Sequence, residues 1–283
     1  MSEITKTDRT HTFNALAKVI EGTLHMPLAQ TIPTQAHAAL DDTGGYRVQH
    51  TTDYRLEGLI SLSAGHSQVS GSVGSKPGHG WSTLVTTVIE DLNVMQVVIA
   101  DRVVGQIITE HPLVGYVPTI SFLGTWFESL RIAGHPVHLD LDLDLIGPKP
   151  ANDGSYIRNP EFLSRVSNQY SRILGIEDLP EDLREKYNQL AANLGKTDTV
   201  ECSLVNSASG TYPGRTYGNI IRIPEFGTVN LGKLIITQED PDPVTGVLKK
   251  TTVTITMIDL KLGCAIEGDV PIGGGSSNGT TMP

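Results

Sequence analysis

The sequence predicts a mainly β protein, a sandwich of antiparallel sheets with an inserted helical hairpin. First, extended segments rich in Thr, Val and Ile alternate with turn residues, most clearly between residues 231 and 260, where GKLIITQ and TTVTITMIDL flank DPDPVTG. Second, the chain has 29 glycines and only 5% aromatic residues, so its core must consist of Val, Ile and Leu. Third, 283 residues with a hydrophobic share of 39% are enough to bury one large β core or two modest ones.

The first part of the chain is expected to be extended. Residues 13–30 (FNALAKVIEGTLHMPLAQ) mix alternation with a glycine and a proline, which suits one or two strands better than a helix. Residues 1–45 form an N-terminal segment that ends in a turn, and this segment is a candidate strand for donation to the sheet of a neighbouring chain. A β region over 46–158 follows, with strands expected at 46–62, 66–74, 81–91, 94–110, 117–132 and 137–146.

The pattern changes at Asn159, where the sequence predicts a helical hairpin over residues 159–195, with helices between about 160 and 194. Asn159 suits a helix N-cap, Pro160 the first helical position and Gly175 the stop. Each helix has one apolar face: Phe162, Leu163, Val166, Tyr170, Ile173 and Leu174 in the first, and Leu183, Tyr187, Leu190, Ala191 and Leu194 in the second.

Strands resume at residue 199, and the region 196–272 is expected to complete the same domain. The last residues, 273–283 (GGGSSNGTTMP), have the composition of a flexible tail. Two pairs of segments resemble each other: VVGQIITEHP parallels NLGKLIITQEDP, and TTVIEDLNV parallels TITMIDLKL. They are either two copies of one β unit or strands of convergent composition.

Two parts of the chain carry a resemblance to a known family. The run TLVTTVIEDLNVMQVVIADRVVGQII followed by a G-H-P segment, and later IRIPEFGTVNLGKLIIT with TTVTITMIDLKLGCAIEGDVPIGGG, resemble the choice-of-anchor P family of bacterial surface proteins. The likeness lies in an aspartate after a Thr/Val strand, a Pro-Gly-Thr-Val link, Thr-rich final strands and a Gly-rich end. It implies an extracellular β-sheet protein and supplies no catalytic residues. The chain departs from the family in its helical hairpin and in lacking a signal peptide or an anchor.

Composition and motifs argue against several functional classes. A formal net charge of -10 without basic clusters argues against a nucleic-acid partner. No window reaches the roughly 18 apolar residues of a membrane span, because the best window, 94–108, is broken by Asp101 and Arg102. The motifs G-x-S-x-G, G-x-G-x-x-G, H-E-x-x-H and the Walker loop are missing, so we do not expect an enzyme.

The start of the chain, MSEITKTDRTHTF, lacks the charged and apolar regions of a signal peptide. From the resemblance we expect a location outside the cell or at the cell surface. The alternative is a cytoplasmic location.

The aspartates of GHPVHLDLDLDLIG are a candidate calcium site. Strand alternation places Asp140, Asp142 and Asp144 on one face, where carboxylates or carbonyls from a facing loop would complete the ligand set of a hard cation. The turn residues Glu239, Asp240 and Asp242 are the candidates for that loop. The alternative is a solvated face whose like charges discourage edge pairing. No other cofactor is expected.

Two further pairs of residues are candidate sites. Cys202 and Cys264 each lie beside an expected strand, and they are either joined by a disulfide or remain two buried thiols. Trp81 and Trp126, with Phe127, are a candidate platform for a sugar ring, and the alternative is that they pack in the core.

We therefore expect a non-catalytic structural protein of the cell exterior that forms homo-oligomers or polymers. If each subunit donates a strand in one direction, the contact does not close and gives a filament. A carbohydrate- or protein-binding β module is the alternative. A hydrolase whose residues assemble from distant positions is the third possibility.

Overall fold

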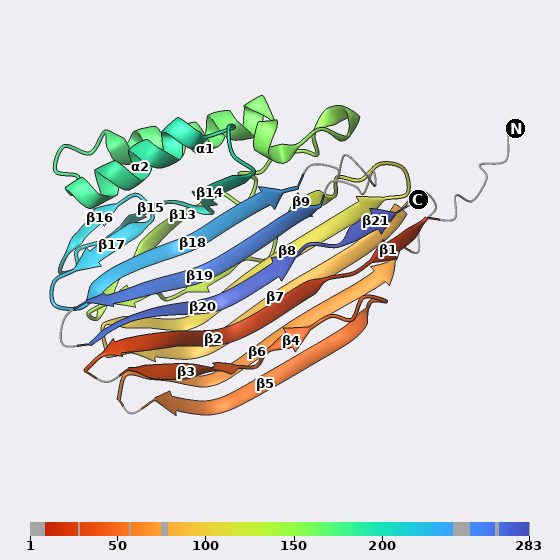
Figure 1. Ribbon diagram of the computed structural model, residues 1–283. Coiled ribbons are helices and arrows are strands. Elements are labelled where there is room, and N and C mark those ends of the chain that lie inside the picture. Colours follow the sequence, from red (N-terminus) through yellow and green to blue (C-terminus); the bar gives the residue numbers. More distant parts are fainter. Residues whose placement is uncertain are drawn as a thin grey trace, which may run out of the picture.

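The computed structural model describes residues 9–27, 29–56, 58–74, 79–239, 250–263 and 266–282. In this part of the chain two large antiparallel sheets lie face to face, and two helices lie along one border of the sandwich (Figure 1). The predicted fold, a sandwich-like β protein with a helical insertion, is confirmed. Within the described ranges, no helix has the length and apolar character needed to cross a membrane.

The eight-stranded sheet is formed by the continuous stretch 45–136. Its strands lie in the order β12-β11-β8-β7-β6-β5, and β9 and β10 also pair with β8. Side chains alternate between the core and the outer face, so that Val85 and Ile89 of β7 are buried. The bounds are β5 Gly45–Leu56, β6 Ile60–Val73, β7 His79–Val94, β8 Val98–Pro112, β9 Thr119–Ser121, β10 Trp126–Glu128, β11 Arg131–Ile132 and β12 His135–Pro136.

The nine-stranded sheet joins the N-terminal strands to the second β region. Its order is β16-β17-β18-β19-β20-β2-β3, with β14 paired to β18 and β4 paired to β2. The bounds are β2 Ala15–Met26, β3 Gln30–Gln35, β4 Ala38–Ala39, β14 Thr199–Ser203, β16 Arg215–Tyr217, β17 Ile220–Ile223, β18 Gly227–Gln238, β19 Thr251–Gly263 and β20 Glu267–Ser277. Two small pairs complete the β structure: β1 Thr10–Thr12 with β21 Thr280–Met282, and β13 His138–Leu141 with β15 Val205–Ser209.

Three strands of the N-terminal segment, β2, β3 and β4, belong to the chain's own nine-stranded sheet. β2 lies between β20 and β3, and its inward residues Ala17 and Val19 are fully buried. Strand donation by this segment would therefore require an interior strand to leave the sheet.

The Gly-rich end of the chain corrects the expectation of a flexible tail over 273–283. Residues 273–277 belong to β20, which pairs with β19 and β2, and β21 pairs with β1. Glycine is needed here because the sheets approach closely: a Cβ on Gly275 would lie 2.8 Å from Cγ1 of Val85 in the opposite sheet. A glycine-rich stretch that looks like a flexible linker is thus part of a strand, where the small residue allows the two sheets to pack closely.

Two expected strands are interrupted. The expected strand 46–62 contains the β5–β6 hairpin, where Gly58 has a φ of +75°. The expected strand 117–132 is divided into β9, β10 and β11, and Gly124 and Ser129 between them also have positive φ. Apolar residues continue through these turns, so composition alone did not reveal them.

The helical hairpin agrees with the prediction. It consists of α1 Pro160–Leu174 and α2 Glu181–Asn193, and the Asn159 side chain accepts hydrogen bonds from the first-turn amides. Short 3₁₀ turns at Ala151–Asp153 and Tyr156–Arg158 precede it. Ala191, assigned to the apolar face of α2, is exposed because that face is narrower near the helix end.

Candidate functional site: a charged cleft beneath the helical hairpin

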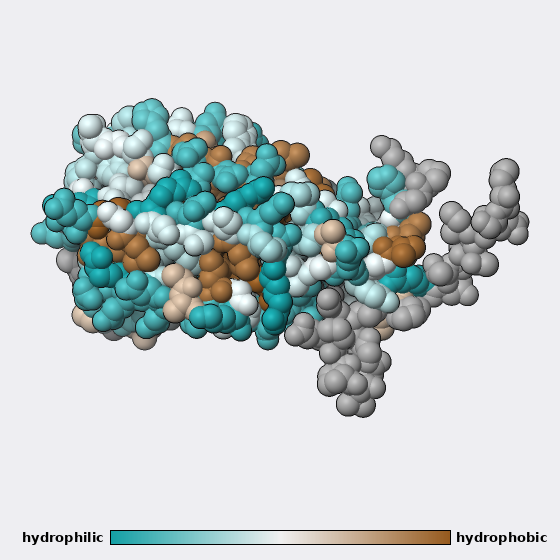
Figure 2. Space-filling view, turned by 90° about the horizontal axis from the view of Figure 1, so that it is seen from above, coloured by the Kyte–Doolittle hydropathy of each residue, from teal (hydrophilic) through white to brown (hydrophobic). Residues whose placement is uncertain are grey.

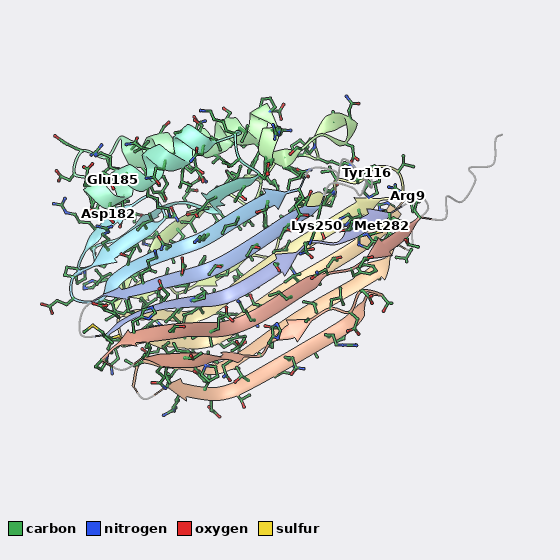
Figure 3. The ribbon with its side chains drawn as sticks, in the orientation of Figure 1. Arg9, Tyr116, Asp182, Glu185, Lys250 and Met282 are labelled. Carbon is green, nitrogen blue, oxygen red and sulfur yellow. The ribbon has the colours of Figure 1, made fainter. Side chains whose placement is uncertain are left out.

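A cleft of about 310 Å³ lies between the helical hairpin and the outer face of the nine-stranded sheet, and we call it the hairpin cleft. Side chains of α1 and α2 form one wall, and side chains of β14, β17, β18 and β19 form the other. Figure 3 labels Asp182, one of the lining residues, on α2 at one end of the molecule. Seen from above, the surface on the side of the helices is largely hydrophilic, with hydrophobic strips between the polar groups (Figure 2).

Buried hydrogen bonds fix the helices over the sheet. The Gln169 amide of α1, which is 6% exposed, donates from Nε2 to the Ser203 carbonyl over 2.8 Å, and its Oε1 accepts from the Ser203 N–H over 3.2 Å. The Tyr170 hydroxyl donates to the Glu201 carbonyl. Because both residues lie on the buried side of α1, they tie this helix directly to the backbone of β14.

A local irregularity brings polar residues of β18 to the floor of the cleft. Thr228 and Asn230 face outward, as alternate residues of a strand do. If the alternation continued, residue 232 would be the next to face outward. Gly232 has a φ of +61°, and the ladder to β19 skips this position, so that Lys233 faces the cleft instead. A Cβ on Gly232 would lie 3.0 Å from Cγ2 of Val205, so a larger residue would be both strained and crowded.

The cleft gathers oppositely charged side chains from five elements. Lys186 of α2 lies 2.7 Å from Glu201 of β14, and Lys233 of β18 lies 3.5 Å from Asp259 of β19. The other charged lining residues are the ion pair Arg222–Asp182 and Lys261. Four basic and three acidic groups give a local balance of +1 (four minus three), whereas the whole chain carries -10.

The positive potential of the cleft acts on Glu201. Burial by itself would raise the pKa of this carboxyl, but Lys186, Lys233 and Lys261 outweigh burial and hold the pKa below its ordinary value. Glu201 therefore stays ionised at neutral pH, and the cleft keeps its full set of charges.

One thiol and two hydroxyls in the cleft wall are held neutral. Burial raises the pKa of the Cys202 thiol and of the Tyr170 and Tyr187 hydroxyls. A thiol in this state is a poor nucleophile. The groups of the cleft are thus suited to hydrogen bonding and charge pairing.

A second polar cluster lies where β1 pairs with β21, and we call it the terminal cluster. The His11 ring stacks on Trp81 with 5.2 Å between centroids, and its centroid is 4.5 Å from that of His111. His11 Nδ1 lies 2.9 Å from the Thr281 hydroxyl. Burial lowers the pKa of His11 to about 4 and, together with the nearby His11, lowers that of His111 to about 3. Both rings are therefore neutral at neutral pH.

The two tryptophans predicted as a sugar platform are not brought together. Trp81 is 9% exposed and pairs with His111, whereas Trp126 is 43% exposed and pairs with Val104. The two positions are seven residues apart along β8, which corresponds to about 23 Å. Trp81 also lines a separate cavity of about 360 Å³ beside His79, Glu110 and Lys149.

The aspartates predicted as a calcium site do not share one strand face. β13 ends at Leu141, and Asp142 and Asp144 belong to the following turn, in which the Asp144 N–H donates to Asp142 Oδ1 over 3.2 Å. Asp140 remains on the strand and is exposed. Glu239 is exposed, and Asp240 and Asp242 lie outside the described residues. No cluster of three metal-ligating side chains is found in the part of the chain that the structure covers.

Cys202 is a buried thiol on β14. Cys264, its predicted disulfide partner, lies outside the described residues.

Sequence reasoning missed the hairpin cleft, although two signals for it exist. Gln169 interrupts the apolar face of α1 between Val166 and Tyr170, as expected for a buried amide with a specific partner. The polar residues of β18 and β19 share the face that an amphipathic helix would cover. Only the order of the strands reveals that these two surfaces meet.

Comparison with known families gives a match over most of the chain. Residues 11–237 match the model of a family described as a domain of unknown function (DUF8256). No curated protein and no solved structure matches the chain.

Proposed function

The chain belongs to the DUF8256 family, and we propose that it is a non-catalytic binding module that holds a small acidic carbohydrate in the hairpin cleft. The observation that carries this proposal is the convergence of four basic side chains on one cleft of an acidic protein. A volume of about 310 Å³ is at the lower end of the range for small-molecule pockets, which favours one or two sugar rings.

The lining matches the chemistry of an acidic sugar. Sugar hydroxyls both donate and accept hydrogen bonds, and so do the amides of Asn206, Asn219 and Asn230 taken together. The excess of basic groups favours a carboxylate on the ligand, because an anion gains Coulomb energy beside Lys233 and Lys261. A neutral sugar would lack this second contribution.

The proposal is tested by isothermal titration of the whole chain with glucuronate, with glucose as the neutral comparison. We expect saturable binding of glucuronate and at least tenfold weaker binding of glucose, about 1.4 kcal/mol. Lys233→Gln should weaken glucuronate binding by a similar factor. Lys196→Gln, which changes an exposed lysine outside the lining, is the matched control. Absence of binding at millimolar glucuronate, or equal binding of glucose, rejects the proposal.

A second candidate is a structural role outside the cell, which the resemblance to choice-of-anchor P proteins implies. The long strand β5 at the border of the eight-stranded sheet favours it, because an unpaired strand edge can pair with another chain. Electron microscopy of the purified protein tests this role: filaments support it, and uniform small particles reject the filament form.

A further inference from the structure

Two histidines face each other across neighbouring strands of the eight-stranded sheet. His50 of β5 lies directly opposite His66 of β6, and their ring centroids are 5.7 Å apart with an angle of 53° between the ring planes. His50 is exposed, and His66 is half-buried on the outer face, because its neighbours Gly65 and Ser67 point into the sandwich. Side chains at directly opposite positions of an antiparallel pair are close enough to contact the same small ligand.

The ring nitrogens of this pair are available for a ligand. In the part of the chain that the structure describes, neither ring forms a hydrogen bond or an ion pair with the protein. The histidines of the terminal cluster differ, because His11 Nδ1 lies 2.9 Å from the Thr281 hydroxyl and His111 is only 3% exposed. Of these two pairs, His50 and His66 are therefore the one that a ligand can reach from solvent.

The His66 ring is neutral at neutral pH. Burial, His50 and Arg102 hold its pKa below the ordinary value, and Glu90 opposes this only in part. Glu90 and Arg102 also form an ion pair with each other over 3.1 Å, so these two neighbouring charges largely balance. A neutral imidazole is the form that binds a metal ion, because the nitrogen lone pair must be free of a proton.

The spacing of the two rings suits one shared metal ion. An imidazole nitrogen binds a first-row divalent metal at about 2.0–2.1 Å, so two rings on one tetrahedral ion have centroids about 5 Å apart. The observed 5.7 Å is close to this separation, and the exposed His50 side chain needs only a small rotation to reach it. No third side-chain ligand completes a cluster within the described ranges, so water fills the other positions of such an ion.

We propose that His50 and His66 together bind one divalent transition-metal ion on the outer face of the eight-stranded sheet. Imidazole suits Cu²⁺, Zn²⁺ and Ni²⁺ rather than Ca²⁺ or Mg²⁺, and Cu²⁺ is the strongest binder of the divalent series. The ion joins β5, at the border of the sheet, to its ladder partner β6. This inference does not depend on the hairpin cleft.

Isothermal titration with Cu²⁺ at neutral pH tests the site. A Cys264→Ser background removes a thiol that competes for the metal. We expect one tight site per chain, and His50→Gln and His66→Gln should each weaken it at least about tenfold, because the second ligand of a chelate acts at a high effective concentration. His138→Gln, which changes an exposed histidine outside the pair, should leave the tight site unchanged.

Stoichiometry separates one shared ion from two independent histidines. Independent histidines would bind two equivalents of Cu²⁺, and each single variant would lose one equivalent without a change in affinity. Thermal unfolding gives a second measure, because Zn²⁺ bound to the folded state should raise the Tm of the Cys264→Ser chain but not that of either glutamine variant. Absence of a tight site, two independent equivalents, or a Tm shift that survives His50→Gln overturns the proposal.

Discussion

The two polar clusters, the hairpin cleft and the terminal cluster, lie toward opposite ends of the sandwich. They differ in the charge state of their buried polar side chains. In the hairpin cleft, Glu201 remains charged because Lys186 and two further lysines outweigh the effect of burial on its pKa. In the terminal cluster, His11 and His111 remain neutral because burial makes their charged forms unfavourable. Figure 3 shows the separation, with Asp182 and Glu185 at one end and Arg9, Tyr116 and Met282 at the other. The first cluster is therefore suited to a charged ligand, whereas the second joins strands β1 and β21.

The largest expected effect concerns the bonds that fix α1 over the cleft. Gln169→Ala leaves the N–H and the carbonyl of Ser203 buried without partners, so we expect the free energy of unfolding to fall by about 2–4 kcal/mol. Urea unfolding monitored by circular dichroism measures this change. Gln68→Ala, on the uncovered face of β6, should change it by no more than about 0.5 kcal/mol. Equal effects of the two substitutions would contradict the anchoring role of Gln169.

The next largest effect is a pH dependence of stability that comes from the terminal cluster. The folded state holds the pKa of His111 at about 3, below the ordinary 6.5, so the unfolded state takes up a proton first as the pH falls. The contribution of His111 to the free energy of unfolding is therefore complete above about pH 7 and declines below pH 6.5. At pH 5 the decline is about 2 kcal/mol.

Phenylalanine at this position tests the pH effect. His111→Phe keeps a ring but cannot titrate, so its unfolding free energy should fall less between pH 7 and pH 5 than that of the unmodified chain. His138→Gln, which changes an exposed histidine, is the control. Parallel pH profiles for the His111 variant and the unmodified chain would show that this histidine does not limit stability in acid.

The smallest expected effect concerns the charge balance of the cleft. Lys186→Gln removes the cation nearest to Glu201, so the pKa of Glu201 should rise towards its ordinary value. Because both side chains are partly exposed, the free energy of unfolding at neutral pH should fall by less than about 1 kcal/mol. Carboxyl chemical shifts measured over a pH titration report the change, with Lys196→Gln as the control. An unchanged titration of Glu201 would assign its low pKa to groups other than Lys186.

Local signals were sufficient to predict the helical hairpin and the class of fold. Asn159, Pro160 and Gly175 mark the ends of α1 because capping depends on a few consecutive residues. The alternation of apolar and polar residues identified most long strands, because it too depends only on neighbouring residues. The turns inside apolar stretches, such as the one at Gly58, could not be predicted. The residues on both sides of such a turn are strand formers, so they look like one continuous strand.

The site required information that is not local. Gly275 lies in a run with the composition of a linker, and the close approach of Val85 in the opposite sheet explains why it is a glycine. Lys186 and Glu201 are near in sequence, but Lys233 and Asp259 reach the same cleft only through the order of strands in the sheet. Sequence alone could therefore name polar residues without showing which of them meet.

The pairing of β1 with β21 brings the first and the last described strand together. Thr10 lies opposite Met282, so strands β1 and β21 lie side by side at one end of the sandwich (Figure 1). The hairpin cleft lies toward the other end. A short linker joining β1 to β21 would therefore permit circular permutation, with new ends in a surface turn.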